Sequence, residues 1–118
     1  MILVDTSIWI DHLNNSNDDL IKLLNSGRVC IHSFIIGELS CGNISNRSEI
    51  LTLLKALPRA EPALDEEVLA LIENKKLYGL GLGFVDVHLL ASALIHNVKI
   101  WTGDKTLKKI AKKLNIHK

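Results

Sequence analysis

Short apolar runs alternate with longer helical segments along this chain of 118 residues, and this alternation constrains its fold more than any other feature. Residues 1–4, 29–31 and 98–102 have the length and composition of buried strands. Strands joined through helices require right-handed crossovers, which give a parallel sheet covered by helices on both faces. We therefore predict an α/β fold, a three-layer α/β/α sandwich with a mostly parallel central sheet.

The helix boundaries are predicted from caps and breakers in the sequence. Ser33 is expected to cap one helix, and Asn46 with Glu49 has the pattern of a capping box for the next. A short strand is also expected near residues 59–61. We expect helices up to about residue 13, from 18 to before Gly27, over 34–41, from 46 to before Pro58, and over 65–77, 84–96 and 105–114.

The composition indicates one folded domain over residues 1–118, because 47% of the residues are hydrophobic and a chain of this length has room for a single core. Two cysteines, Cys30 and Cys41, are too few for a disulfide framework, which favours a reducing cytoplasm. The N-terminus lacks the pattern of a signal peptide, and no stretch approaches the roughly 18 apolar residues of a membrane span. We expect a cytoplasmic protein.

Four acidic residues stand where predicted strands end or predicted helices begin. Asp5 follows the first apolar run and Asp104 follows the last, while Glu38 and Asp86 lie near the starts of two helices. The functional crevice of an open parallel sheet forms outside the carboxyl ends of its strands. The four carboxylates are therefore expected to converge there.

Converging carboxylates repel one another and need a compensating cation. All four ligands are hard oxygens and no cysteine or histidine set has the spacing of a zinc site, so Mg²⁺ or Mn²⁺ is favoured. Such an ion on carboxylates supports in-line hydrolysis of a phosphodiester. We predict a magnesium- or manganese-dependent nuclease in which Asp5, Glu38, Asp86 and Asp104 are both the catalytic residues and the metal ligands.

Each acid also has a structural interpretation that involves no catalysis. Asp5 and Asp86 are both placed to stabilise a helix N-terminus through its dipole. Glu38 is equally placed to be a solvated helix residue, although its apolar neighbours favour a partly buried position. Gly103 followed by Asp104 is a pair that is common in turns, so Asp104 has a structural interpretation as a turn residue.

The segments that carry these acids together resemble the VapC-type toxins of the PIN-domain family. They are residues 3–13 (LVDTSIWIDHL), 36–39 (IGEL), 83–93 (GFVDVHLLASA) and 101–105 (WTGDK). The resemblance implies a PIN-like nuclease domain and a metal-dependent endoribonuclease, the toxin of a type II toxin-antitoxin pair. It also implies a homodimer, a VapB-type antitoxin that covers the acidic groove, and hydroxyls at Thr6 and Thr102 that orient a carboxylate or water. Gly103 and Phe84 replace the basic residue and the tryptophan common in close relatives, which affects substrate contacts only.

Basic and histidine side chains offer further candidates. The last predicted helix carries lysines suited to RNA phosphates, and a solvated helix face is the alternative for any one of them. His88 is two positions from Asp86 and on a different side of the helix, so we expect a structural role or one supporting the metal ligands. The lysines of the expected RNA-binding patch are Lys105, Lys108, Lys109 and Lys112.

Two other functions compete with the nuclease. A phosphatase working through a covalent Asp5 intermediate requires a second aspartate two positions on, where this chain has Ser7. A non-catalytic PIN-like binding module acting through its antitoxin and operator DNA is the main alternative, and the retention of all four acids argues against it.

Overall fold

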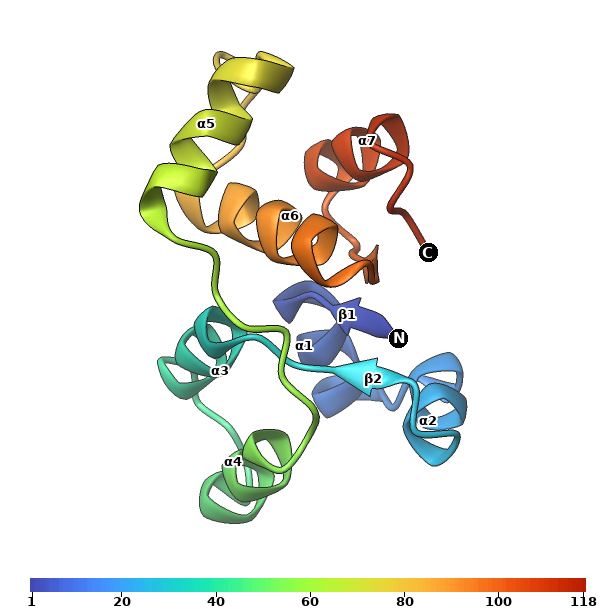
Figure 1. The fold of residues 1–118 in the computed structure, drawn as a ribbon. Helices are drawn as coiled ribbons and strands as arrows, with labels where there is room; N and C mark the ends of the chain where they lie inside the picture. The colour runs from blue at the N-terminus through green and yellow to red at the C-terminus, as the bar shows by residue number, and fades with distance from the viewer.

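Three short strands and seven helices alternate along the chain in the computed structural model, which describes residues 1–118 (Figure 1). The strands are β1 (Ile2–Val4), β2 (Val29–Cys30) and β3 (Lys99–Trp101). The helices are α1 (Thr6–Asn15), α2 (Asp18–Asn25), α3 (Ser33–Ser40), α4 (Arg47–Lys55), α5 (Asp65–Lys75), α6 (Phe84–His96) and α7 (Lys105–Lys113).

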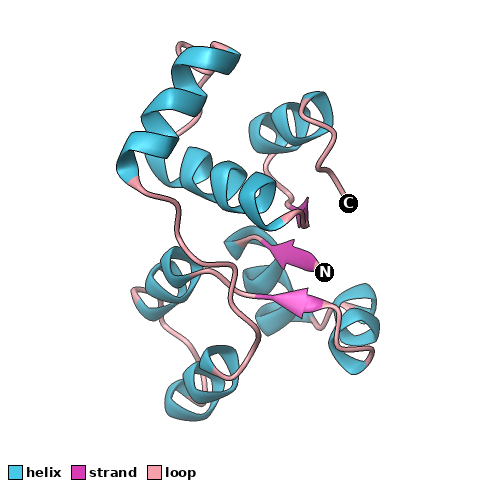
Figure 2. Cartoon of the chain, viewed as in Figure 1, coloured by secondary structure: helices cyan, strands magenta, loops and turns pink.

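The three strands form a parallel sheet in the order β2-β1-β3 at the centre of the molecule (Figure 2). Leu3 of the middle strand pairs with Cys30 on one side and with Ile100 on the other. Single parallel bridges extend both edges, from Ile31 to Arg59 and from Ile100 to His117. The prediction of a mostly parallel sheet is confirmed, but the strand expected at 59–61 is reduced to one bridge.

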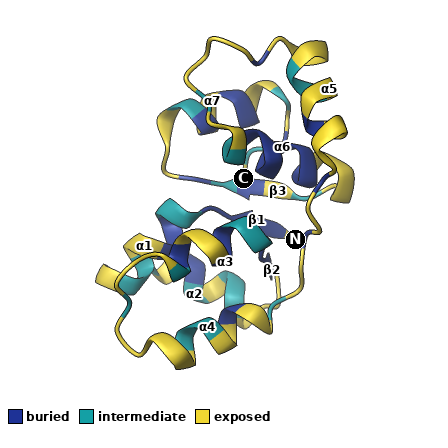
Figure 3. Cartoon of the chain, turned by 90° about the vertical axis from the view of Figure 1, so that its left-hand side faces the viewer, coloured by how far each residue is buried: buried dark blue, intermediate teal, exposed yellow.

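Helices cover the sheet from two sides, which completes the predicted α/β/α arrangement. Figures 1 and 3 show α5, α6 and α7 on one side of the strands and α1 to α4 on the other. The buried residues lie on the strands and on the helix faces turned toward them, and every residue from Val87 to Ala93 of α6 is buried (Figure 3). The longest helix, α6, has 13 residues, and no helix has the length and hydropathy needed to cross a membrane.

Two of the predicted helix caps are wrong. The backbone N–H of Phe34 donates to His32 Nδ1 at 3.0 Å, so His32 caps α3 and Ser33 is the first helical residue. Asn46 has a left-handed backbone (φ 54°) and makes no side-chain cap, so no capping box opens α4. Both residues have side chains suited to capping. Ser33 lies one position too late in the chain and Asn46 has an unsuitable backbone conformation, and the sequence reveals neither.

The helix ends that depend on left-handed residues were predicted more accurately. Gly27 follows α2 with φ 67°, and Asn97 ends α6 with φ 54°, as expected of residues that tolerate this conformation. The predicted range of α6 is confirmed. α1 continues two residues beyond the predicted end, and α4 ends at Lys55, before Pro58 is reached.

A buried histidine joins α3 to α6 by a chain of hydrogen bonds. Because His32 Nδ1 accepts from Phe34, the proton is on Nε2, which donates to Ser92 Oγ at 3.1 Å, and Ser92 Oγ donates to the carbonyl of Glu61 at 2.9 Å. Burial lowers the pKa of His32 to about 4, with the charges of His88 and His96 adding to the effect. His32 is therefore neutral in the folded protein.

This burial predicts a loss of stability in acid. A histidine with a lowered pKa contributes stability that is complete above its unfolded value near 6.5 and is lost as the pH falls toward 4. His32→Asn keeps an acceptor for the Phe34 N–H and removes the titrating ring. Between pH 6.5 and 4.5 the unfolding free energy of the variant is expected to fall by about 1 to 2 kcal/mol less than that of the parent. Urea unfolding at several pH values measures this difference, and parallel curves would refute it.

Candidate active site

Asp5 is held between the carboxyl ends of β1 and β3. Its backbone N–H donates to the carbonyl of Trp101 at 2.9 Å, which continues the ladder between the two strands. The side chain does not cap α1. Instead Asp5 Oδ2 accepts from Thr102 Oγ1 at 2.7 Å and from Ser7 Oγ at 3.1 Å. The Asp5 side chain therefore does not make the hydrogen bond by which an N-cap aspartate stabilises a helix.

The turn after β3 fixes Asp104 beside Asp5. Thr102 Oγ1 accepts from the backbone N–H of Asp104 at 3.0 Å while it donates to Asp5. Gly103 N donates to Ser7 Oγ at 2.9 Å, so the same turn is also tied to the start of α1. Asp104 Oδ2 accepts from Leu107 N at 2.8 Å and caps α7. Asp104 therefore also has the structural role in a turn that its sequence position indicated.

Ser7 is the residue that the sequence analysis missed as part of this site. Its hydroxyl accepts from Gly103 and donates to Asp5, which joins two acid-bearing segments. The signal in the sequence was a hydroxyl residue two positions after an acid at a strand end. That signal is weak, because serine is common at the start of any helix.

Asp86 lies in the first turn of α6, where its Oδ2 accepts from Gly83 N at 3.0 Å. Burial raises the pKa of Asp86, the hydrogen bond from Gly83 opposes this, and the charges of Asp5 and Asp104 raise the pKa further. Asp5 and Asp104 are therefore near enough to Asp86 for their charges to act on it, although the three acids come from three different elements.

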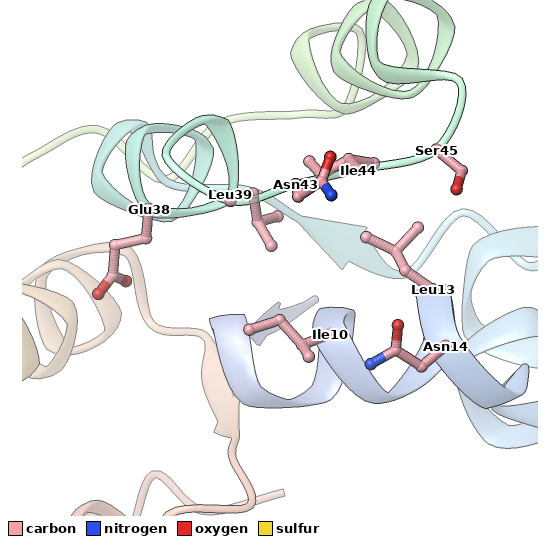
Figure 4. Close-up of a pocket in the computed structure, with 9 residues that line it drawn as sticks. Ile10, Leu13, Asn14, Glu38, Leu39, Asn43, Ile44 and Ser45 are labelled. Atoms are coloured by element: carbon pink, nitrogen blue, oxygen red, sulfur yellow. The ribbon is translucent and has the colours of Figure 1, made fainter.

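Glu38 extends from α3 toward the start of α1. Thr6 Oγ1 donates to Glu38 Oε1 at 2.7 Å, and Thr6 directly follows Asp5 in the chain. Glu38 is exposed and stands at one end of a pocket between α1 and α3 (Figure 4). The fourth acid is thus linked to the other three through a hydroxyl and not through direct contact.

The four carboxylates share one arrangement that suits a hard cation. One oxygen of each is held by a hydrogen bond from the chain, and the other accepts none. The free oxygens are the ligand type that Mg²⁺ and Mn²⁺ take. No three histidine, cysteine, aspartate or glutamate side chains are close enough to hold an ion as they stand. The donor set fits such a metal, and binding by three acids would require their side chains to approach one another.

Three helices begin at this site, which offsets part of the repulsion between the acids. Asp5 precedes α1, Asp86 lies in the first turn of α6 and Asp104 precedes α7. The positive end of each helix dipole stabilises a nearby carboxylate by about 0.3 to 1 kcal/mol. The fold therefore tolerates a concentration of negative charge that three isolated turns would not.

Comparison with known proteins agrees with this arrangement. The model of the PIN domain family matches residues 2–113, which include all four acids. The chain belongs to the PIN domain family. Two curated relatives, both Ribonuclease VapC32, come from Mycobacterium tuberculosis strains CDC 1551 / Oshkosh and ATCC 25618 / H37Rv. Each is 43% identical over 109 residues, which cover 92% of this chain and 88% of the relative. The predicted resemblance to VapC-type PIN toxins is confirmed.

His88 of this PIN domain contacts none of the four acids through its hydrogen bond or its ring contacts. Its Nε2 is 3.2 Å from Asp65 Oδ1 on α5, and its ring packs edge-on against Phe34 and Phe84. Burial of the ring between α3, α5 and α6 explains why it faces away from Asp86, two residues earlier. Of the two expected roles, these contacts favour the structural one.

The lysines of the predicted patch lie on the solvent face of α7. Leu107, Ile110 and Ala111 of that helix are buried in the PIN domain core, which turns the opposite face outward. The spacing of the exposed lysines follows the helical repeat, so they share one face that begins next to Asp104. These exposed lysines are Lys105, Lys108, Lys109 and Lys112.

Proposed function

We propose that this PIN domain is a metal-dependent endoribonuclease, the toxin of a VapBC-type pair, with Asp5, Glu38, Asp86 and Asp104 as catalytic residues and metal ligands. The observation that carries the proposal is geometric: Thr102 holds Asp5 and the backbone of Asp104 together, Asp86 is near enough for their charges to raise its pKa, and each acid has one carboxylate oxygen without a hydrogen bond. The identity to a relative named as a ribonuclease supports RNA as the substrate.

The chain's own residues orient and hold this site. Mg²⁺ or Mn²⁺, when bound, supplies positive charge that stabilises the attacking and leaving oxygens of a phosphodiester. Thr102 and Ser7 hold the Asp5 carboxylate in one orientation, so metal binding would require the other acids to move toward Asp5. Thr6 orients Glu38 in the same way. Asp86 carries a charge that its surroundings disfavour, and that charge becomes favourable beside a cation.

The basic face of α7 is proposed to hold the RNA backbone beside the acids. Phosphates approaching four carboxylates are repelled, and a lysine face starting at Asp104 counters that repulsion. Contacts of this kind release counterions, so RNA binding is expected to weaken as salt concentration rises. The patch comprises Lys105, Lys108, Lys109 and Lys112.

Expression of the chain in bacterial cells tests the proposed function directly. Induction is expected to arrest growth and to create new RNA 5′ ends at a small set of sites, which sequencing of those ends maps. Asp5→Asn, which keeps the size of the side chain, is expected to abolish both effects. Growth arrest by the variant without new ends would instead indicate a non-catalytic PIN module.

Thr102→Val is expected to reduce RNA cleavage by about ten- to a hundredfold. Valine fills the same buried space but removes the donor to Asp5 and the acceptor for the Asp104 N–H. Thr102→Ser retains the hydroxyl and serves as the matched control, which is expected to keep most of the cleavage activity. The kcat/KM values of both variants, compared with that of the parent, measure the contribution of the hydroxyl. Equal activities for valine and threonine would show that the hydroxyl does not position the acids.

Two protein partners belong to the proposal: a VapB-type antitoxin and a second copy of the chain. The second copy has a candidate surface on α5 and α6, where Leu69, Leu94 and Ile95 are exposed large apolar residues. Light scattering is expected to give a mass near twice 13.1 kDa. A monomer at all concentrations would refute the homodimer. A toxin that acts on cellular RNA with these partners is expected to work in the cytoplasm.

A further inference from the structure

A pocket of about 260 Å³ opens beside Glu38, between α1 and the segment that joins α3 to α4. In Figure 4 Glu38 stands at one end and Ser45 at the other, with Ile10, Leu13 and Asn14 rising from α1 toward Leu39, Asn43 and Ile44. Gly42 completes the lining. The pocket therefore adjoins the candidate active site and shares Glu38 with it.

The lining suits a flat group with a polar edge better than it suits a phosphate. Ile10, Leu13, Leu39 and Ile44 provide apolar walls, and no lysine or arginine is among the lining residues. A phosphate would meet only Glu38 as a charged neighbour, and that charge repels it. The volume is below the roughly 300 Å³ at which sites for drug-sized molecules begin, so the pocket accepts a single small group.

Apart from Glu38, the polar side chains of the lining are unpaired within the chain. The side chains of Asn14, Asn43 and Ser45 make no hydrogen bond to other residues, and all three are exposed. An asparagine amide offers a donor and an acceptor side by side, which is the pattern that reads a base edge. Single-stranded RNA is recognised mainly through unstacked bases placed in such pockets.

One wall of the pocket is held in place by an arginine outside it. Arg47, at the start of α4, donates to the carbonyl of Gly42 at 3.1 Å and to that of Ser40. These bonds fix the chain on either side of Cys41, just ahead of Asn43. A site that discriminates between bases needs rigid walls, because a flexible loop would adapt to any base.

We propose that this pocket binds one unpaired nucleobase of the RNA next to the cleaved bond, and that Asn14 and Asn43 contact its edge. The proposal rests on the proposed RNA cleavage and gives it a source of sequence preference. A base seated here brings the adjoining phosphodiester toward Glu38. The residues that select the cleavage site are then distinct from the four acids that cleave it.

Binding of the four ribonucleosides to the full chain tests the pocket without any cleavage. Nucleosides carry no phosphate, so the acids do not repel them. NMR titration is expected to show saturable shifts in the millimolar range for the methyl groups of Ile10, Leu39 and Ile44, and these shifts are expected to differ between bases. Asn14→Leu is expected to remove the difference. Asn15→Leu, at the next position of the same helix and outside the lining, is the matched control and is expected to behave as the parent.

Cleavage of RNAs that differ at one nucleotide provides the second measurement. The ratio of kcat/KM between preferred and disfavoured bases is expected to fall by about tenfold in Asn14→Leu and Asn43→Leu. Asn14→Asp and Asn43→Asp, which keep the side-chain shape, are expected to change the preferred base, and circular dichroism checks that all variants fold.

Three outcomes separate this pocket from the proposed function. RNA cleavage with unchanged preference in all four variants, and no nucleoside shifts, would overturn the base pocket while leaving the nuclease intact. Nucleoside shifts without RNA cleavage would support the pocket and contradict the nuclease. If the four variants keep the base preference of the parent but are inhibited more weakly by the antitoxin, the pocket binds the antitoxin. That result would overturn the proposal.

Discussion

Asp86→Asn is expected to reduce RNA cleavage by about a thousandfold or more while the protein remains folded. Asparagine keeps the size of the side chain and an oxygen for the Gly83 N–H, but it removes the negative charge that a divalent cation requires. Charge stabilisation by a bound metal is worth several kcal/mol in the transition state, and about 4 kcal/mol corresponds to the stated factor. Single-turnover cleavage of a defined RNA measures the loss.

The same substitution is expected to stabilise the protein when no metal is present. The pKa of Asp86 is raised by burial and by Asp5 and Asp104, so the folded state binds its proton more tightly than the unfolded state. The ionised side chain therefore costs stability at neutral pH, and this cost disappears as the pH falls and Asp86 becomes protonated. In EDTA at pH 7.5 we expect the variant to melt about 1 to 3 °C higher. At acidic pH the difference should vanish, and a lower melting temperature at pH 7.5 would contradict the account.

Removal of divalent metal is expected to stop cleavage and to lower the melting temperature together. A chain freed of contaminating nucleases should lose at least about a hundredfold in rate in EDTA, because the acids alone repel the substrate phosphate. Millimolar Mg²⁺ or Mn²⁺ should restore the rate and raise the melting temperature by a few degrees, since an ion that binds only the folded chain stabilises it. Calorimetry and the cleavage assay follow both effects over one titration.

The matched control for the metal titration is Asp86→Asn, which should show no melting shift on addition of the ion. Full cleavage in EDTA would refute the metal-dependent mechanism. A melting shift of the same size in the variant would place the ion elsewhere on the protein.

Much of the fold and the positions of the acids were predictable because local patterns determine them. A buried apolar run that ends in an acid marks Asp5 at the end of β1, and a glycine-rich connection before a strongly apolar helix marks Asp86. The C-terminal limit of α6 follows from Asn97, which adopts the left-handed conformation (φ 54°) that asparagine tolerates.

The remaining features depend on contacts between distant residues, which no local pattern contains. Ser7 matters because Gly103 lies against it, and His32 caps α3 while it also reaches Ser92 on another helix. His88 faces Asp65 because three helices bury it there. The pocket beside Glu38 exists only because α1 and α3 are brought together.

The middle strand of the sheet, β1, pairs directly with β3, which lies almost a hundred residues further along the chain. Asp5 therefore acquires the hydrogen bond from Thr102, which is 97 residues further along, only when β3 has joined the sheet. Contacts over such separations form late in folding. A chain in which β3 is not yet paired with β1 accordingly lacks the assembled acids, so the site is completed only together with the sheet.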